Sequence, residues 1–411
     1  MVHVQGPMKT PPPGLKRLES HGLQAAERSH IPAFEVMRIT GEIAEARAAG
    51  RDVVSLCAGE PSARPAPNNI TAAGYTSPLG TIELREAIAG HYDRWYGAKV
   101  DPARIAITTG SSGAFQLGFL AAFNPGDRVA LASPGYPAYR NILTALGIEV
   151  VELPTTLESR YQPTPAMLDA AARDGGPLAG LIVASPANPT GSMLTRDELR
   201  ALHSWCVRNS TLFVSDEIYH GITYPQAGAT DPRGTSAMQF GDESLVINSF
   251  SKYWGMTGWR LGWAILPEYL VAPFEALASN FALSAPSPAQ EFALDAFSEE
   301  TYAEREAVVA GFARSRELIL EAEASLGWGA SSPADGAFYY YADLGPQLEW
   351  CGDSVTYAKR LLDEADVAIV PGVDFDPDAG NRTVRLSFAA GVPAVEEALA
   401  RIIAFQEKVA R

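Results

Sequence analysis

The sequence predicts an α/β protein, built on a mainly parallel sheet and completed by a smaller α+β unit. From about residue 35, short apolar runs alternate with longer amphipathic segments, which is the pattern of parallel strands joined by crossover helices. Small or polar residues follow four of the five apolar runs, at the point where each predicted strand ends. After about residue 290 a long helical stretch replaces this alternation, which indicates a second unit.

Five apolar runs have the length and composition of buried strands. They are "RIAITTG" (104–110), "DRVALASP" (127–134), "GLIVASP" (180–186), "TLFVSDE" (211–217) and "SLVINSFS" (244–251). Helical stretches lie between them, and Thr195 with Glu198 predicts a capping box at the start of one. In the second unit we expect a helical region at about 288–325, the segment "GAFYYYADL", another helix and the strand "RTVRLSFA". A helix near 34–49 is expected to pack on it.

The composition limits the partners and the compartment. A net charge of −16 argues against nucleic acid or an anionic membrane as the main partner. No apolar run approaches the roughly 18 residues that span a bilayer, and residues 1–30 suggest a flexible lead-in rather than a signal peptide. Three distant cysteines (Cys57, Cys206 and Cys351) and scattered histidines offer no disulfide framework or metal site. We therefore expect a cytoplasmic globular protein.

The polar residues at the strand ends are expected to converge on one site. They are Thr108–Ser112, Ser185–Asn188, Ser215–Asp216 and Asn248–Lys252. Open parallel sheets bind their ligands in the crevice at the carboxyl ends of the strands. These segments therefore predict the position of a ligand site, but not the identity of the ligand.

Each segment has a functional and a purely structural interpretation. In "TTGSSGAFQLGF" (108–119), N–H groups and two hydroxyls at a helix start would cradle a phosphate, but an ordinary capped turn fits equally well. Two prolines direct Asn188 in "SPANPTG", where a surface turn is the alternative. Asp216 follows an apolar strand, where a carboxylate needs a cationic partner unless it caps a helix.

Lys252 lies in "SFSKYWGMTGWRLGW", among aromatic residues where an ordinary surface lysine is not expected. Taken together, the segments suggest one ligand with four groups. These are a phosphate for the serines and Arg260, a protonated ring nitrogen for Asp216, a ring oxygen for Asn188 and Tyr219, and a carbonyl for Lys252. Pyridoxal phosphate has all four groups.

The ordered set of segments resembles the class I pyridoxal-phosphate-dependent aminotransferases of fold type I, in particular their bacterial aspartate aminotransferase-like branch. The matching segments are "SLCAGEPS", "YTSPLGTIELREAI", "TTGSSGAF", "SPGYPAY", "ASPANPTG", "SDEIYHG", "SFSKYWGMTGWRLGW" and "VRLSF", over about residues 35–405. The resemblance implies a large pyridoxal-phosphate-binding domain at 60–287, with a mainly parallel seven-stranded sheet and helices on both faces. It also implies a small α+β domain at 31–59 and 288–411.

By resemblance, the protein moves an amino group between an L-amino acid and a 2-oxo acid, through a Lys252 aldimine and pyridoxamine phosphate. Lys252 would also move the proton at the substrate Cα. Asp216 keeps the cofactor's ring nitrogen protonated, Tyr219 and Asn188 bond the ring oxygen, and Tyr136 stacks on the ring. These implied roles make Lys252, Asp216 and Tyr219 the catalytic residues.

The other implied contacts are to the phosphate and to the substrate. The phosphate positions are Ser111, Ser112, Gly113, Ser249, Ser251 and Arg260, joined in a homodimer by Tyr75 of the neighbouring subunit. Arg385 would bind the substrate α-carboxylate, assisted by the backbone at Gly59 and by the Asn188 side chain. The resemblance implies no metal.

Two departures from the family pattern bear on the substrate. Ser112 stands where one dicarboxylate-specific branch has a lysine for the distal carboxylate, and 279–290 contains no arginine that could replace it. An unpaired distal carboxylate in a buried pocket is strongly disfavoured, so we expect a neutral or aliphatic side chain, unless Arg64 supplies the charge. The segment 62–75 is also too short and proline-rich for the helix that the family has there, which would open the pocket entrance.

Other functions stay open on the sequence alone. They include an aspartate or glutamate aminotransferase and a lyase, decarboxylase or cyclising synthase, since these enzymes share their first steps and pocket groups decide the later ones. A regulator that uses this domain as a sensor would need a DNA-binding module, for which residues 1–34 are too short and proline-rich. A nicotinamide enzyme is disfavoured because no G-x-G-x-x-G follows the first strand.

Overall fold

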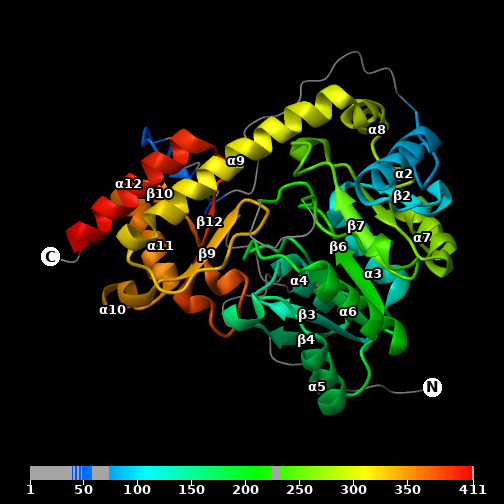
Figure 1. Ribbon diagram of the computed structural model, residues 1–411, viewed down its shortest axis with the longest axis horizontal. Helices are drawn as coiled ribbons and strands as arrows, with labels where there is room; N and C mark the ends of the chain where they lie inside the picture. The colour runs from blue at the N-terminus through cyan, green and yellow to red at the C-terminus, as the bar shows by residue number, and fades with distance from the viewer. Residues whose placement is uncertain are drawn as a thin grey trace, which may run out of the picture.

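The computed structural model describes Ile39, 42–43, 46–47, 49–57, 74–224 and 232–409, and its largest element is a seven-stranded sheet (Figure 1). The sheet has the strand order β2-β8-β7-β6-β5-β3-β4, and only β8 runs antiparallel to its neighbours. The strands are β2 (Ile105–Thr108), β3 (Arg128–Ser133), β4 (Glu149–Pro154), β5 (Gly180–Ala184), β6 (Leu212–Asp216), β7 (Leu245–Ser249) and β8 (Gly262–Ile265). The predicted α/β class with a mainly parallel sheet is confirmed.

Helices cover both faces of this sheet, because successive strand residues point to opposite sides. Ile105 and Ile107 belong to one apolar cluster, whereas Ala106 between them belongs to another. The first cluster is completed by α2 (Ile82–Tyr96), α5 (Pro165–Gly175) and α6 (Arg196–Arg208). The second is completed by α3 (Gly110–Ala122), α4 (Pro137–Ala145) and α7 (Glu268–Phe281). At the start of α6, Thr195 and Glu198 form the predicted capping box.

A second group of elements forms around two small sheets. The three-stranded antiparallel sheet has the order β11-β12-β9, and β1 pairs with β10 in parallel. The strands are β1 (Val54–Ser55), β9 (Tyr339–Asp343), β10 (Val367–Ala368), β11 (Val370–Pro371) and β12 (Thr383–Ser387). The helices are α10 (Leu348–Cys351), α11 (Ser354–Ala365) and α12 (Val392–Val409). Ile39 and Ile43 pack here, in one apolar cluster with Leu362 and Val370.

The helices α8 (Ser287–Ala293) and α9 (Glu299–Leu326) connect the two groups. Helix α8 packs on α2, beside the large sheet, and the long α9 packs along α12 (yellow and red in Figure 1). A boundary at 287/288 therefore falls at the start of α8, and the expected division into 60–287 and the remainder stays a prediction. No helix in the described part of the chain is long and apolar enough to cross a membrane.

Candidate active site

The predicted convergence of polar residues forms one cavity at the carboxyl ends of β5, β6 and β7. The cavity measures about 290 Å³. Its lining residues are Ser111, Ser112, Phe115, Tyr136, Pro137, Tyr139, Asn188, Asp216, Ile218, Tyr219, Ser251, Lys252, Thr257, Arg260, Tyr339, Phe375 and Arg385. Among them, Lys252, Arg260 and Arg385 are cationic and Asp216 is acidic, so the cavity suits a ligand that carries several negative charges.

Asp216 is the last residue of β6 and is 4% exposed. The Tyr139 hydroxyl donates to its Oδ2, and the Ile218 N–H donates to its Oδ1 at 3.0 Å. Burial raises the pKa of Asp216 to about 6, while these two bonds and the charge of Lys252 oppose the shift. A cation in the cavity would therefore be held strongly here, because it would remove the cost of burying this carboxylate.

Lys252 lies three residues beyond β7, in a turn that serine side chains stabilise. The Ser249 hydroxyl donates to Ser251 Oγ at 2.7 Å and to the Leu261 carbonyl at 3.1 Å. The Lys252 Nζ lies 6.0 Å from the centre of the Tyr219 ring and 5.9 Å from that of Phe338. The amine is thus half-buried between aromatic faces, at the side of the cavity where Asp216 lies.

The start of α3 and Arg260 form the basic end of the cavity. Gly110 has a φ of +68°, and a Cβ there would lie 2.5 Å from the Arg260 Nη2. A larger residue at 110 would therefore displace the guanidinium, which also donates to the Thr257 carbonyl at 2.9 Å. Helix N-termini attract anions through their free N–H groups. Ser111, Ser112 and Arg260, which all line the cavity, together have the donors and the charge of an anion site.

Arg385 lines the same cavity from β12 and is 3% exposed. It donates to Asn188 Oδ1 at 2.9 Å and to the Cys57 carbonyl at 2.7 Å. Its Nε has no hydrogen-bond partner among the described residues. A guanidinium carries five N–H donors, so these contacts orient the side chain and leave donors for a carboxylate.

The tyrosines Tyr136, Tyr219 and Tyr339 also line the cavity. The Tyr219 and Tyr339 hydroxyls are 2.8 Å apart. Burial raises the pKa of Tyr219 well above the usual value and that of Tyr136 to about 12, so both phenols stay protonated at neutral pH. They can therefore act as hydrogen-bond donors to a ligand.

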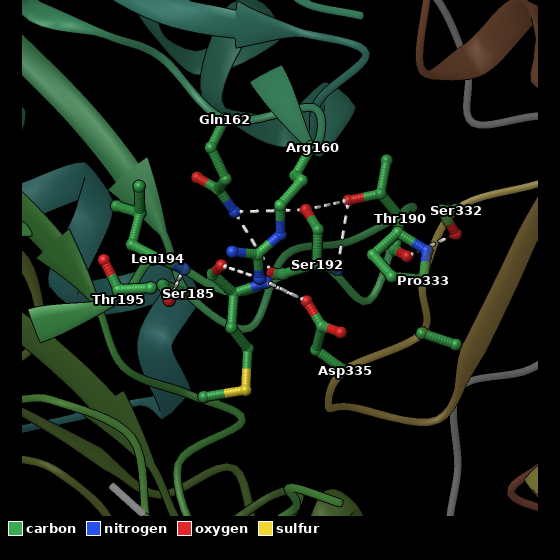
Figure 2. A network of polar contacts seen from close by, with 12 residues as sticks. Arg160, Gln162, Ser185, Thr190, Ser192, Leu194, Thr195, Ser332, Pro333 and Asp335 are labelled. Carbon is green, nitrogen blue, oxygen red and sulfur yellow. Dashed lines mark hydrogen bonds and ion pairs between the residues drawn. The ribbon is translucent and has the colours of Figure 1, made fainter. Parts of the chain in front are cut away.

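A network of polar contacts supports the loop that carries Asn188 (Figure 2). Arg160 Nη2 donates to Asp335 Oδ2 at 2.6 Å and to the Met193 carbonyl at 2.7 Å (Figure 2). The Ser332 hydroxyl donates to the Thr190 carbonyl at 2.6 Å. These bonds join the segment before β9 to the loop after β5. They therefore stabilise the position of the loop that carries Asn188.

Most of the predicted site residues meet in this cavity. Those that line it are Ser111, Ser112, Tyr136, Asn188, Asp216, Tyr219, Ser251, Lys252, Arg260 and Arg385. Ser249 is fully buried behind Ser251, Gly113 lines a neighbouring apolar cavity, and Tyr75 is 84% exposed. Gly59, Arg64 and most of the segment 62–75 lie outside the described residues.

The sequence interpretation missed several cavity residues, namely Phe115, Tyr139, Tyr339 and Phe375. Tyr139 had a signal, because it lies three residues after Tyr136 in "SPGYPAY", one helical turn away at the start of α4. No local sequence pattern marks Tyr339 or Phe375 as a cavity residue. Their place in the cavity depends on how the two parts of the chain pack together.

Comparison with known proteins identifies the family. The family model for "Aminotransferase class I and II" matches residues 49–403. The valine–pyruvate aminotransferase of Mycobacterium tuberculosis is 45% identical over 388 residues, covering 92% of this chain and 97% of its own. An aminotransferase crystal structure from the same organism has a TM-score of 0.87 at 44% identity, covering 94% of this chain and 99% of that one.

A more distant structure, the Thermus thermophilus aspartate aminotransferase with maleate, has a TM-score of 0.83 at 30% identity and covers 93% of this chain and 99% of that one. The expectation of a fold type I aminotransferase is confirmed by these matches, which extend over nearly the whole chain. The chain therefore belongs to the class I and II aminotransferase family.

Proposed function

We propose that this aminotransferase uses pyridoxal phosphate, held in the cavity around Lys252, to move an amino group from a neutral or aliphatic L-amino acid to a 2-oxo acid. The observation that carries the proposal is the convergence of Asp216, Lys252, Arg260 and Arg385 on one cavity of about 290 Å³. These four residues come from three distant segments of the chain and supply a carboxylate, an amine and two guanidinium groups to one space.

The donor set in the cavity fits pyridoxal phosphate. The buried carboxylate of Asp216, with its raised pKa, suits a cationic ring nitrogen, and the α3 N-terminus with Arg260 suits a phosphate. When bound, this cofactor supplies a carbonyl for amines and a ring that takes up the electron pair released at the amino acid Cα. Metal ligation is not part of the proposal.

Each lining residue then has a defined role. Arg260, Ser111, Ser112 and Ser251 bind the phosphate, and the buried Ser249 positions Ser251. Gly113, which lines the neighbouring apolar cavity, is proposed to contribute only through the backbone in the first turn of α3. These roles are consistent with the exposed guanidinium of Arg260 beside the start of the helix.

The remaining residues act on the ring and on the substrate. Asn188 and Tyr219 would hold the ring oxygen, Tyr136 would pack on the ring face, and Asp216 would hold the proton of the ring nitrogen. The Lys252 amine would hold the cofactor through its carbonyl carbon, and as a free amine it would move the proton at the substrate Cα. Arg385, with Asn188 and the backbone at Gly59, binds the α-carboxylate.

The charges of the cavity favour a neutral substrate side chain. The three cations among its described lining residues are already assigned to phosphate, amine chemistry and α-carboxylate. No further cation remains among those lining residues for a distal carboxylate, whose burial without a partner costs several kcal/mol. The relative named valine–pyruvate aminotransferase supports the same class.

An aspartate or glutamate donor is the second candidate, since a relative of known structure is named aspartate aminotransferase. It would require a cation from outside the described lining, for which Arg64 is our candidate. A lyase, decarboxylase or cyclising synthase would instead consume the amino acid without a 2-oxo acid acceptor.

We also propose a homodimer in which Tyr75 reaches the partner's phosphate. Tyr75 is 84% exposed, although the backbone of its neighbour Thr76 is fixed by a 3.3 Å bond to Ser284 Oγ. Phe281 is 68% exposed beside an apolar cavity of about 460 Å³, which would be covered by a second copy. A cytoplasmic location stays part of the proposal, supported by three free cysteines.

The test is the visible absorption spectrum of the enzyme loaded with pyridoxal phosphate, mixed with one amino acid at a time and no 2-oxo acid. Valine or alanine should remove the visible band in a single turnover, and pyruvate should restore it. Aspartate should not remove the band. Conversion by aspartate and not by valine would overturn the neutral substrate class, whereas ammonia release with the band retained would indicate a lyase.

A further inference from the structure

Tyr339 contacts two of the proposed active-site residues at once. Its hydroxyl lies 2.8 Å from that of Tyr219, and the centre of its ring lies 4.4 Å from Arg385 Cζ. Tyr339 is 2% exposed and lines the cavity. The sequence indicates no role for this residue, which lies in the run "FYYYADL".

The position of Tyr339 is fixed by the small antiparallel sheet. It begins β9 and pairs with Ser387 of β12, two residues beyond Arg385. Side chains two residues apart on a strand share a face, so Tyr339 and Arg385 lie on the same side of the sheet as diagonal neighbours. The next residue, Tyr340, points to the opposite side, where its hydroxyl donates to Glu323 Oε1 at 3.0 Å.

We propose that Tyr339 is a positioning residue that couples substrate binding to the cofactor: its hydroxyl orients Tyr219, and its ring orients Arg385. The inference rests on the proposed function, since it assigns Tyr219 to the cofactor ring and Arg385 to the substrate carboxylate. It adds a residue from β9 that touches both of these groups and links them through one rigid side chain.

The hydroxyl contact sets the strength of Tyr219 as a donor. A phenol has one proton, so when Tyr219 donates to the cofactor's ring oxygen, Tyr339 is the donor in the bond between the two hydroxyls. Hydrogen bonds in such a chain strengthen one another. Tyr339 therefore makes Tyr219 a better donor to the ring oxygen.

The ring contact acts on Arg385 in a different manner. A guanidinium over an aromatic face is attracted by the ring's negative face, and here both groups are buried. Phe375 lies 4.8 Å from the same Cζ, so Arg385 has a second aromatic contact. The fork of the arginine is thereby held while Asn188 and Cys57 accept two of its hydrogens.

Two substitutions separate these contacts in the enzyme loaded with pyridoxal phosphate. Tyr339→Phe removes the hydroxyl and keeps the ring, whereas Tyr339→Leu removes both. In Tyr339→Phe the hydrogen bond from Tyr219 to the ring oxygen should be weaker. The ring oxygen can then interact more strongly with the proton on the nitrogen that would join Lys252 to the cofactor, and so stabilise it. The pH titration of the visible band should therefore shift upward in Tyr339→Phe, by about half a pKa unit or more.

The kinetic effects should separate in the same way. Tyr339→Phe should lower kcat about three- to tenfold and leave the KM for the amino acid unchanged. Tyr339→Leu should also raise that KM, because Arg385 loses its support. Tyr340→Phe is the matched control on the other side of β9 and should behave as wild type in both measurements.

A band that titrates at the same pH in Tyr339→Phe and wild type would overturn the role of the hydroxyl. A KM that rises equally in the Phe and Leu variants would overturn the role of the ring. A KM that stays at the wild-type value in Tyr339→Leu would overturn it as well. If Tyr339→Leu does not fold, the Phe variant still decides the role of the hydroxyl, and Tyr339→Met, which also lacks the ring, takes the place of the Leu variant in the KM measurement. A wild-type enzyme that shows no visible band would instead contradict the proposed function itself.

Discussion

Arg385 donates a 2.9 Å hydrogen bond to Asn188 Oδ1, across 197 residues of chain. The bond joins β12 of the small antiparallel sheet to the loop after β5 of the large sheet. We propose Arg385 for the substrate carboxylate and Asn188 for the cofactor ring, so the bond joins a proposed substrate contact directly to a proposed cofactor contact. A substrate carboxylate bound to Arg385 would thus affect the cofactor through the Arg385–Asn188 hydrogen bond.

The first prediction concerns this arginine. Arg385→Lys keeps the charge but loses the planar fork that Asn188 and Cys57 orient. Breaking a buried, hydrogen-bonded charge contact costs about 2 kcal/mol or more, so kcat/KM for the amino acid should fall at least about 30-fold. The loss should appear in KM, with the visible band retained, whereas Arg382→Lys, at an exposed position directly before β12, should change neither value.

The second prediction concerns the tyrosine that the sequence interpretation missed. Tyr139→Phe removes the hydroxyl that donates to Asp216 and leaves the carboxylate with fewer partners. Because bonds to charged groups contribute about 1.5–3 kcal/mol, pyridoxal phosphate should bind about tenfold or more weakly. Asp216→Asn should be more severe, with kcat reduced about 100-fold or more. Equal cofactor affinity in Tyr139→Phe and wild type, measured by titration of protein fluorescence, would contradict this role of the Tyr139 hydroxyl.

The third prediction is a pH dependence of stability. Burial raises the pKa of Glu217 from 4.5 to about 7, although bonds from Ala237, Ser236, Tyr92 and Ser215 oppose the shift. The folded protein therefore binds this proton more tightly than the unfolded chain does. The contribution to stability is complete below pH 4.5 and is lost as the pH rises through about 7.

Glu217→Gln removes this titration while it keeps the shape of the side chain. The free energy of unfolding of the variant, measured in denaturant between pH 5 and pH 8 (roughly the window that the shift defines), should fall less steeply with pH than that of wild type. Glu158→Gln, at an exposed position, is the control and should keep the wild-type slope. Parallel curves for Glu217→Gln and wild type would show that this carboxyl does not titrate as described.

The fourth prediction concerns the pair Arg160 and Asp335 in Figure 2. The Asp335 side chain is 5% exposed, so its carboxylate depends on Arg160 and the Met193 N–H, 3.2 Å away. A double-mutant cycle of Arg160→Met and Asp335→Asn should give a coupling free energy of about 1 kcal/mol or more. The exposed pair Arg200 and Asp197 should give less than about 0.5 kcal/mol. Similar couplings in both cycles would mean that the pair does not support the Asn188 loop.

The sequence predicted the strands whose apolar runs are continuous, such as Gly180–Ala184, and it predicted the residues at their ends. It did not predict β4 and β8 as strands. Only one of the six residues of β4 is buried at the sheet edge, which weakens an apolar pattern. The four residues of β8 form the segment "GWAI", which overlaps the end of the motif that carries Lys252 and Arg260, and they are too few for a clear period.

The site was predictable where it depends on strand ends and less so where it depends on packing between distant segments. Asp216 ends β6, and Asn188 and Lys252 lie just beyond the ends of β5 and β7, so the sheet itself brings them together. Tyr339 meets Tyr219 across 120 residues, and nothing local in "FYYYADL" distinguishes the first tyrosine from the next two. Only the register of β9 against β12 turns Tyr339 toward the cavity.

Every role proposed for the cavity depends on Lys252 carrying pyridoxal phosphate, and the most direct test of that bond is chemical. The loaded enzyme would be reduced with borohydride, which fixes a lysine–cofactor bond, then digested and sequenced by mass spectrometry. We expect the reduced cofactor on the peptide that contains Lys252, and none in Lys252→Ala treated in parallel. A label on another lysine, or an unlabelled Lys252 peptide from enzyme that shows the visible band, would refute the assignment.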